Sequence, residues 1–313
     1  MPSTNITLDQ AAEFLRSRDN FLLVTHKNPD GDTLGSALAL CLALRGNGKT
    51  AHLLRNAQVT ALYAPAVEAF FVPEYDPAYT AVSIDASVAS QLQKNYDGFP
   101  IGLTFDHHAS HRGYAENYYV GDTASCGEVI LAVLRTLNWH ITPDIAYWLY
   151  VAVATDTGCF RYSNTTQATL QAGADLVRLG APNAEINRKF ISAKRRSRLL
   201  LEGAILGNLQ FHDKGRVVLA FITLETLKAA GADVYDLDDI ANIAAQCDGP
   251  EVAATLREMP DGTTKISVRT IGEANANDIC AKLGGGGHAR ASGVSLSVGI
   301  EEAAALFLEA CKS

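Results

Sequence analysis

The chain has 313 residues, of which 48% are hydrophobic and 19% charged, and its formal net charge is −8. This length is sufficient for two domains that each bury a core. The negative net charge argues against a protein that binds along long nucleic acid, because such a protein normally carries a basic groove. A small phosphorylated ligand fits this charge better, and no groove for long nucleic acid is expected.

Neither a membrane segment nor a disulfide framework is indicated. No apolar run reaches membrane-spanning length, and the first residues lack a basic region followed by an apolar core. The six cysteines are scattered, without a C-x-x-C pair. This usage is typical of reduced thiols rather than of structural zinc or disulfides. We therefore expect a cytoplasmic protein with no membrane partner.

In the first part of the chain, short runs rich in β-branched residues alternate with longer amphipathic segments. Strands are expected at 21–25, 51–55, 80–84 and 101–105. Helices are expected at 34–45, 127–137, 145–155, 166–179 and 184–206. Alternating strands and helices predict an α/β fold, a doubly wound parallel sheet with right-handed crossovers.

The pattern then changes to a second, smaller mixed α+β domain. Its strands are expected at 216–222, 251–258, 264–270 and 291–297, and its helices at 274–283 and 301–310. We predict a first domain over residues 1–190, a helical linker over 191–212 and a second domain over 213–313.

Acids and histidines gather where strands of the first domain end, and one further acid follows an apolar helix. In chain order these residues are His26, Asp30, Asp32, Asp85, Asp106, His107, His108 and Asp156. The carboxyl ends of parallel strands meet at one edge of the sheet, which is where open α/β sheets bind ligands. We therefore expect these side chains to converge.

So many carboxylates in one place indicate bound cations. Burying them together is costly unless cations neutralise their charge. Carboxylates mixed with imidazoles suit manganese, iron or zinc better than calcium. One bridging carboxylate can hold two such ions about 3.5–4 Å apart, which lowers the pKa of a shared water.

Each motif alone is more often a turn, a helix cap or a surface pair. Together, at equivalent strand ends, they predict a metal site. The histidines without comparable neighbours in the sequence are expected to be structural; they are His52, His111, His140 and His212.

A glycine run at 284–287 precedes His288 and Arg290 in the second domain. The alternative interpretation is a flexible linker, but the run is short and lies between a predicted helix and a predicted strand. Consecutive glycines let backbone N–H groups approach an anion closely. His288, Arg290 and Arg269 would add charge for a phosphate or a ribose edge. We expect a binding site here.

With these residues placed, the chain resembles the DHH-family phosphoesterases that carry a DHH-associated C-terminal domain, over essentially its full length. The matching motifs are His26-x-x-x-Asp30-x-Asp32, Asp85, Asp106-His107-His108, Asp156 and the Gly-Gly-Gly-Gly-His of residues 284–288. The compact layout is similar to the branch of nanoRNases and pAp phosphatases, and the segment 160–165 supports that placement.

The resemblance implies two divalent ions, expected to be Mn²⁺. The ligands of the first would be His26, Asp30 and Asp85. The ligands of the second would be Asp32, Asp85, His107 and Asp156, with Asp85 bridging. Two residues would be catalytic: His108 would contact the scissile phosphate, and Asp106 would orient the histidines.

The resemblance also implies a set of substrate-binding residues. These are Ser125, Arg161, Arg269, Gly286, Gly287, His288 and Arg290. Cys126 and His111 depart from the family pattern, in which a serine or threonine and an asparagine are common at these places. Both departures concern fine substrate preference rather than the chemistry.

The activity implied is manganese-dependent hydrolysis of very short RNA oligonucleotides, such as dinucleotides, to mononucleotides, or of 3′-phosphoadenosine 5′-phosphate (pAp) to AMP. An activated water would attack in line with the departing ribose oxygen. The second domain would hold the far end of the nucleotide. A homodimer is the oligomeric state that the family suggests.

The main alternative substrate is pApA, the linear breakdown product of a cyclic dinucleotide, and the sequence does not rank the three substrates.

An aspartyl-phosphate phosphatase is disfavoured because Thr33 lies one position too early for an Asp-x-Asp-x-Thr signature that begins at Asp30. Family II pyrophosphatases share the first domain but lack the glycine-rich motif. A non-catalytic nucleotide sensor would be expected to lack some of the metal-ligand residues, and none is missing from this sequence. The negative net charge disfavours a long-strand exonuclease of the RecJ type.

Overall fold

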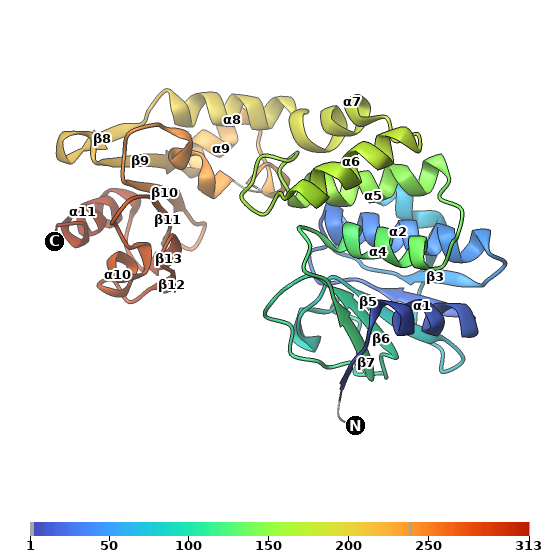
Figure 1. Ribbon diagram of the computed structural model, residues 1–313. Helices are drawn as coiled ribbons and strands as arrows, with labels where there is room; N and C mark the ends of the chain where they lie inside the picture. The colour runs from blue at the N-terminus through green and yellow to red at the C-terminus, as the bar shows by residue number, and fades with distance from the viewer. Residues whose placement is uncertain (1–2, 238–239, 313) are drawn as a thin grey trace. The chain divides into compact units, whose positions relative to one another are not determined.

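The computed structural model describes residues 3–237 and 240–312 and divides into two compact units, Met1–Ala193 and Lys194–Ser313. The first unit is built on a parallel seven-stranded sheet, and the second on a six-stranded mixed sheet (Figure 1). The predicted fold class, a parallel α/β unit with a smaller mixed α+β unit, is confirmed.

The strands of the first sheet are β1 (Thr4–Asn5), β2 (Phe21–Val24), β3 (Ala51–Leu54), β4 (Phe71–Val72), β5 (Thr80–Ile84), β6 (Leu103–Asp106) and β7 (Asn117–Val120). They pair in parallel in the order β1-β7-β6-β5-β2-β3-β4. The chain therefore runs outward from β2 to β4, and then from β5, on the other side of β2, to β7. This reversal between β2 and β5 makes a switch point, where doubly wound sheets bind ligands.

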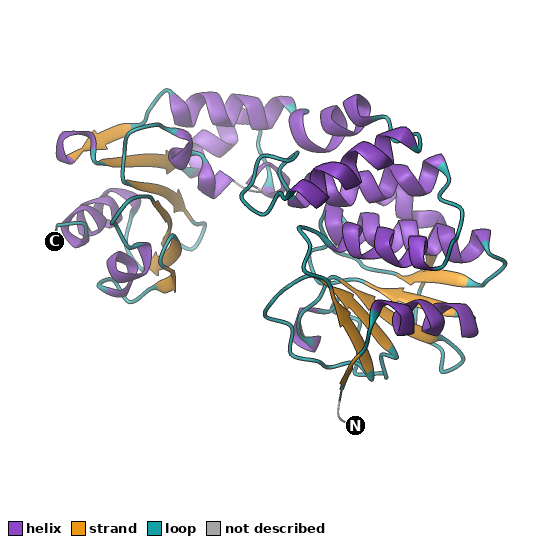
Figure 2. Cartoon of the chain, viewed as in Figure 1, coloured by secondary structure: helices purple, strands orange, loops and turns teal. Residues whose placement is uncertain are grey.

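The helices of the first unit are α1 (Leu8–Ser17), α2 (Gly31–Gly46), α3 (Ala64–Val67), α4 (Cys126–Thr136), α5 (Pro143–Asp156), α6 (Gln167–Arg178) and α7 (Asn183–Ile186). The two sheet faces are covered differently (Figure 2). Phe21 and Leu23 of β2 pack in one core with α1, α2, α4 and α5. Leu22 and Val24 pack against the connection between β5 and β6, including Leu92. Both faces of β2 are thus apolar, as in buried parallel strands.

Helix α2 begins at Gly31, three residues before the predicted start at 34. The Asp30 carboxylate caps it by accepting the N–H groups of Asp32 and Thr33, at 3.0 and 3.1 Å. A Cβ atom on Gly35 would lie 2.5 Å from the Trp148 carbonyl oxygen. The glycine therefore lets α2 lie directly against α5, which carries Asp156 at its end.

The helix predicted at 184–206 is not continuous. Helix α7 ends at Ile186, a π-helical turn spans Asn187–Ser192, and α8 (Arg196–Leu206) begins after extended backbone at Ala193 and Arg195. Leu201 and Ile205 of α8 are buried in a core of the second unit. Helix α8, which covers half of the segment predicted as a helical linker, therefore packs on the second unit, because its apolar face needs a sheet to cover it.

The strands of the second unit are β8 (Gln210–His212), β9 (Val217–Ile222), β10 (Val252–Glu258), β11 (Thr264–Thr270), β12 (Gly286–His288) and β13 (Ala291–Leu296). Their order is β12-β13-β11-β10-β9-β8, with β9 and β10 parallel and the other pairs antiparallel. The remaining helices are α9 (Leu224–Ala230), α10 (Ala276–Ala281) and α11 (Ile300–Ala310).

Residues of β9 alternate between two cores on the two faces of this sheet. Val217 and Leu219 pack with α10 and α11, whereas Val218 and Ala220 pack with α8. This alternation is the period of two expected of a strand. The second part of the glycine run forms β12, an edge strand that the sequence analysis did not predict.

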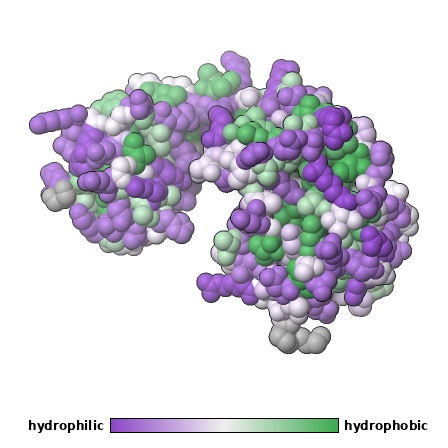
Figure 3. Space-filling view, viewed as in Figure 1, coloured by the Kyte–Doolittle hydropathy of each residue, from purple (hydrophilic) through white to green (hydrophobic). Residues whose placement is uncertain are grey.

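The surface is mainly hydrophilic on the face shown in Figure 3, with small apolar patches between the charged groups. Among the described residues, no helix combines the length and apolar character that a bilayer crossing requires. The six cysteines are free thiols.

Candidate metal centre

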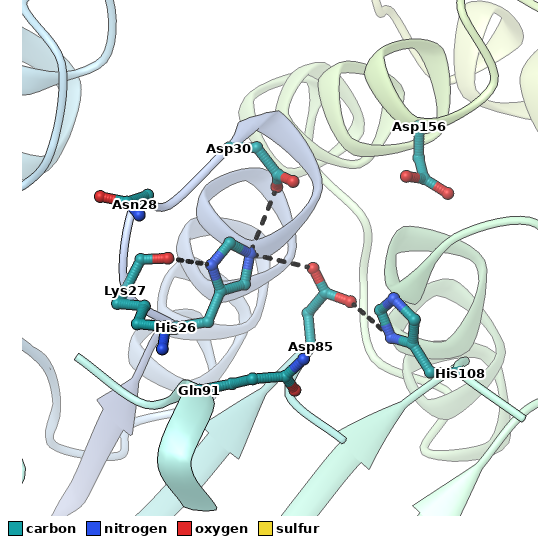
Figure 4. Close-up of a pocket in the computed structure, with 8 residues that line it drawn as sticks. All are labelled: His26, Lys27, Asn28, Asp30, Asp85, Gln91, His108 and Asp156. Carbon is teal, nitrogen blue, oxygen red and sulfur yellow. Dashed lines mark hydrogen bonds and ion pairs between the residues drawn. The ribbon is translucent and has the colours of Figure 1, made fainter. Parts of the chain in front are cut away.

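The carboxyl ends of β2, β5 and β6 and the end of α5 bring together the predicted acids and histidines of the first unit. Figure 4 shows those that line a cavity, which are His26, Asp30, Asp85, His108 and Asp156. Three overlapping groups each place their ligand atoms within 4.8 Å of one another. The groups are His26-Asp30-Asp85, Asp32-His107-Asp156 and Asp85-His107-His108. The convergence expected from the parallel topology is thus present in the structure.

Asp85 lies at the centre of the cluster. One carboxylate oxygen is 3.5 Å from Nε2 of His26, and the other is 3.4 Å from Nε2 of His107. The Oδ1 atom is buried and has no hydrogen-bond partner. A buried carboxylate oxygen left in this way costs free energy, which a bound cation would offset. The donor set of oxygens and imidazoles therefore fits divalent metal ions.

The backbone of Asp85 is also unusual, with φ at 60°. Its N–H donates to the carbonyl of Phe105 at 2.8 Å, which ties the residue to the neighbouring strand β6. Side chains other than glycine rarely adopt this left-handed region, and aspartate is among those that tolerate it best. The turn directs the carboxylate between the two histidines.

Two backbone carbonyls orient the histidines. Nδ1 of His26 lies 2.7 Å from the carbonyl of Lys27, and Nδ1 of His107 lies 3.4 Å from that of Thr123. A carbonyl oxygen only accepts, so Nδ1 carries the proton and Nε2 is left as the ligand atom. Histidines that bind metals are commonly held in this way.

The amino end of α4 holds the carboxylate of Asp32. The N–H groups of Cys126 and Gly127 donate to its two oxygens at 2.7 and 2.9 Å, and the Ser36 hydroxyl donates at 3.2 Å. The helix dipole favours a negative charge at this position. Asp32 therefore has a fixed orientation, with Oδ2 3.7 Å from Nε2 of His107.

Asp156 ends α5 and is less enclosed. Its carboxylate lies 3.9 Å from Nε2 of His107, and the Asn164 amide donates to it at 3.4 Å. Burial raises the pKa of Asp156 to about 6; the His107 charge opposes the shift, and the charges of Asp85 and Asp30 add to it. A nearby cation would keep this carboxylate ionised.

In the metal-free protein, protons on the histidines balance part of the negative charge. Burial alone lowers the pKa of His26, but Asp30 and Asp85 outweigh it and raise the pKa to about 10. His107 behaves likewise: burial lowers its pKa, and Asp85 and Asp32 raise it to about 9. A metal ion would have to displace these protons.

Asp106 is fully buried and joins two histidines. Its Oδ1 lies 2.8 Å from Nδ1 of His108, and its Oδ2 lies 2.8 Å from Nδ1 of His111. Burial raises the pKa of this carboxyl, but the hydrogen bonds from His108 and His111 outweigh it and hold the pKa well below its usual range. His111, which was expected to be structural, supports Asp106 in this way; its place five residues after Asp106 was the signal available in the sequence.

A cavity of about 290 Å³ opens on the cluster. It is lined by His26, Lys27, Asn28, Asp30, Asp85, Gln91, His108 and Asp156. Figure 4 shows these side chains around it, with His26 and His108 on opposite sides of Asp85. Lys27, Asn28 and Gln91 were not predicted. Lys27 and Asn28 stood inside the first motif, whereas Gln91 had no signal in the sequence.

Two predicted substrate-binding residues of the first unit, Ser125 and Arg161, make hydrogen bonds within the protein. Ser125 is buried, and its hydroxyl accepts the N–H of Glu128 as the cap of α4. Arg161 is exposed and donates to the carbonyl of Gly158 at 2.6 Å. Neither lines the cavity. Ser125 therefore shapes the amino end of α4 that holds Asp32.

The second unit brings Arg269 and His288 into one row across three strands. Arg269 of β11 and His288 of β12 are both registered opposite Ala291 of β13. Residues directly opposite each other share a face of the sheet. Gly286 and Gly287 precede His288 on the exposed edge strand, and Arg290 donates to the carbonyl of Ala274 at 3.0 Å.

The comparisons with known proteins agree with this arrangement. Residues 215–313 match the DHHA1 domain family. A Thermus thermophilus protein named bifunctional oligoribonuclease and PAP phosphatase NrnA is 30% identical over 307 residues, covering 96% of this chain and 92% of that protein.

Two solved structures share the fold. An exopolyphosphatase-related protein from Bacteroides fragilis has a TM-score of 0.83 at 23% identity, covering 97% of this chain and 94% of that one. The Thermus thermophilus RecJ protein in complex with Mn²⁺ has a TM-score of 0.51 at 13% identity, covering 98% of this chain and 55% of that one. The chain therefore belongs to the DHH family of phosphoesterases, in the branch that contains the NrnA proteins.

Proposed function

We propose that this protein is a metal-dependent hydrolase of phosphoester bonds. It cleaves very short RNA oligonucleotides to mononucleotides and removes the 3′-phosphate of pAp. The names of its relatives supply these two substrates. The observation that carries the chemistry is the Asp85 carboxylate between His26 and His107, with one oxygen buried and without a hydrogen bond.

Two divalent ions complete the site in this proposal. His26, Asp30 and Asp85 would hold one, and Asp32, Asp85, His107 and Asp156 the other, which is consistent with the first two ligand groups. Manganese is our choice of metal because the RecJ structure with this fold contains Mn²⁺. When bound, such ions would polarise the phosphoryl group and activate water.

His108 and Asp106 act on the substrate side of the site. The hydrogen bond that His108 donates to Asp106 raises the pKa of His108, although partial burial opposes the shift. His108 therefore holds its positive charge more readily near neutral pH, and Nδ1 stays on Asp106. The Nε2–H group is then available to donate to a phosphoryl oxygen as negative charge develops. Asp106, fixed in turn by His111, sets the orientation of that ring.

The second unit supplies further substrate contacts in this proposal. Residues 1–190 carry the catalytic centre, and residues 213–313 bind the nucleotide. The residues that would bind it are Arg269, Gly286, Gly287, His288 and Arg290, together with Arg161 of the first unit. We further propose that the protein acts in the cytoplasm, where six free thiols remain reduced, and that it forms a homodimer, as its family resemblance suggests.

The test is a comparison of three substrates with the purified chain and added Mn²⁺. We expect a 5′-phosphorylated diribonucleotide and pAp to be hydrolysed, and a long RNA to be cleaved far more slowly. Chelation of the metal should abolish both activities. A chain that turned over neither small substrate, or preferred the long RNA, would contradict the proposal. A much higher kcat/KM on pApA than on other dinucleotides would identify cyclic-dinucleotide breakdown as its main role.

A further inference from the structure

The cavity is lined by side chains of two kinds (Figure 4). The acids and histidines described above are the first kind, and the proposed metals would neutralise their charge. Lys27 and Gln91 are of the second kind and are not part of the ligand groups. Of the described residues that line the cavity, Lys27 alone carries a permanent positive charge.

The amide of Gln91 is held in one orientation. Its Oε1 accepts the N–H groups of Ser87 and Val88, at 2.9 and 3.3 Å, and the Ser87 hydroxyl at 2.9 Å. Backbone N–H groups only donate, so this oxygen cannot exchange places with the amide nitrogen. The NH₂ group therefore points away from that loop, and Figure 4 shows the side chain reaching beneath Asp85.

Lys27 lies next to the backbone of Gln91, because its N–H donates to the Gln91 carbonyl at 2.7 Å. Its Nζ lies 3.2 Å from the carbonyl of Ser90, the residue that precedes Gln91. The side chain is exposed, and an ammonium group has two further N–H bonds to offer a ligand. Lys27 and Gln91 thus add a cation and an oriented NH₂ group to the lining of the cavity.

The proposed substrates share one chemical unit. In pAp and in a 5′-phosphorylated dinucleotide, a single nucleoside carries the scissile phosphate on its 3′-oxygen and a second phosphate on its 5′-oxygen. The acids cannot receive that second anion. The cavity volume of about 290 Å³ lies near the lower end of the roughly 300–1,000 Å³ that is usual for small-molecule sites.

We propose that Lys27 and Gln91 form a subsite for the 5′-phosphate of the nucleoside whose 3′-oxygen carries the scissile phosphate. The inference rests on the proposed function and deepens it. A phosphate is recognised well by an ammonium point charge together with an N–H donor of fixed direction. The subsite gives a physical reason for one centre to accept both a dinucleotide and pAp, because each presents the same nucleoside 3′,5′-bisphosphate unit.

The experiment uses two pairs of probes that differ only by this phosphate. The first pair is 5′-phosphorylated ApA and ApA; the second is pAp and adenosine 3′-monophosphate. For each pair we define a preference, the ratio of kcat/KM with the 5′-phosphate to kcat/KM without it. We expect Lys27→Met to lower this preference about tenfold, the scale of one lost charge-assisted contact.

Gln91→Glu is the second variant. It keeps the shape and the oxygen that accepts from Ser87, but it replaces the NH₂ group by a negatively charged oxygen, so the preference should fall at least as far. Lys94→Met is the matched control, because Lys94 is exposed and does not line the cavity. It removes the same charge and should leave both preferences at the wild-type value. Thermal unfolding would verify that all three variants are folded.

The activity of the wild type tests the proposed function, and the preference in the variants tests the subsite. The subsite alone would be overturned if the wild type hydrolysed both phosphorylated probes and Lys27→Met and Gln91→Glu showed the same preference as the wild type. A wild-type protein inactive on all four probes would overturn the proposed function and the subsite with it. A similar loss of preference in Lys94→Met would assign the effect to net charge and would also overturn the subsite.

Discussion

The carboxylate edge of the first unit is the cluster of acids and histidines that follows β2, β5 and β6, and the glycine strand of the second unit is β12 (Gly286–His288). These two regions differ in how firmly their side chains are held. Asp32 is 1% exposed and accepts hydrogen bonds from two backbone N–H groups and a hydroxyl. His288 lies on an exposed edge strand, and its carbonyl accepts one hydrogen bond from the Ser292 hydroxyl. Groups that perform chemistry need fixed positions, because small displacements are costly in rate. Groups that grip a substrate can remain exposed until it arrives.

The surroundings of the two histidines, His26 and His288, show the same difference. His26 pairs in an isolated β-bridge with Leu92, which is 4% exposed and packs in an apolar core of the first unit. His288 is exposed. The comparison therefore predicts that changes at the carboxylate edge act mainly on kcat and metal binding, and that changes at the glycine strand act mainly on KM.

The largest effect is expected for Asp85→Asn. Asparagine tolerates the positive φ of 60° at this position, so the turn should persist while the bridging charge is lost. We expect kcat/KM to fall at least about 10³-fold, because the charge that would join two cations is removed. Steady-state kinetics and Mn²⁺ titration would measure the loss. Near-normal turnover would exclude Asp85 as the bridging ligand.

A smaller loss is expected for His111→Ala. It removes the hydrogen bond to Oδ2 of Asp106, and through Asp106 it loosens His108. Residues that support a ligand or catalytic group in this way typically contribute about 10–100-fold, and we expect this in kcat with little change in KM. His111→Asn retains an N–H donor and should recover part of the rate. If both variants were equally impaired, the hydrogen bond would not be the cause.

The affinity for Mn²⁺ should rise with pH. The pKa values of about 10 for His26 and about 9 for His107 mean that both rings are protonated at neutral pH and must lose protons to bind a metal. Affinity should therefore increase up to about tenfold per pH unit for each proton displaced, until the pH passes these values. Calorimetry in buffers of different ionisation enthalpy would measure the number of protons released when Mn²⁺ binds. Release of no protons would contradict the raised pKa values of the two histidines.

The same pKa shifts have a consequence for the stability of the metal-free protein. A histidine whose pKa is raised by folding contributes stability that is fully present below its unfolded value of 6.5 and is lost as the pH rises through its folded value. The free energy of unfolding should thus fall between about pH 7 and pH 10, and bound Mn²⁺ should reduce that fall. Denaturant titrations with and without metal would measure it.

The smallest effect is expected for His288→Ala. The side chain is exposed, so the fold should tolerate its loss. We expect KM to rise about tenfold, on the scale of one lost charge-assisted contact, while kcat changes less. His140→Ala, at an exposed histidine of the first unit, is the control. A fall in kcat without a change in KM would break the contrast between the two regions.

Much of the fold could be predicted from periodicity. The strands at 80–84 and 264–270 and the helix at 166–179 follow from runs whose period differs between strand and helix. The break between α7 and α8 could not be predicted, because neither proline nor glycine interrupts residues 187–195. Edge strand β12 was missed since glycines have low strand propensity, and only pairing with β13 makes them a strand.

The chemistry of the site was readable because its residues follow strand ends. Once the sheet is parallel, the residues after β2, β5 and β6 must meet at one edge, so His26, Asp85 and His107 could be grouped without coordinates. The sequence by itself thus determined which acids and histidines belong together.

Only the tertiary structure decided how those groups are held and what faces them. The amino end of α4 fixes Asp32, His111 fixes Asp106, and the 87–88 loop orients Gln91. Each of these contacts joins a side chain to a partner whose position depends on packing rather than on spacing. Hydrogen bonds have strict distance and angle limits, which a pattern of residue types along the chain does not encode.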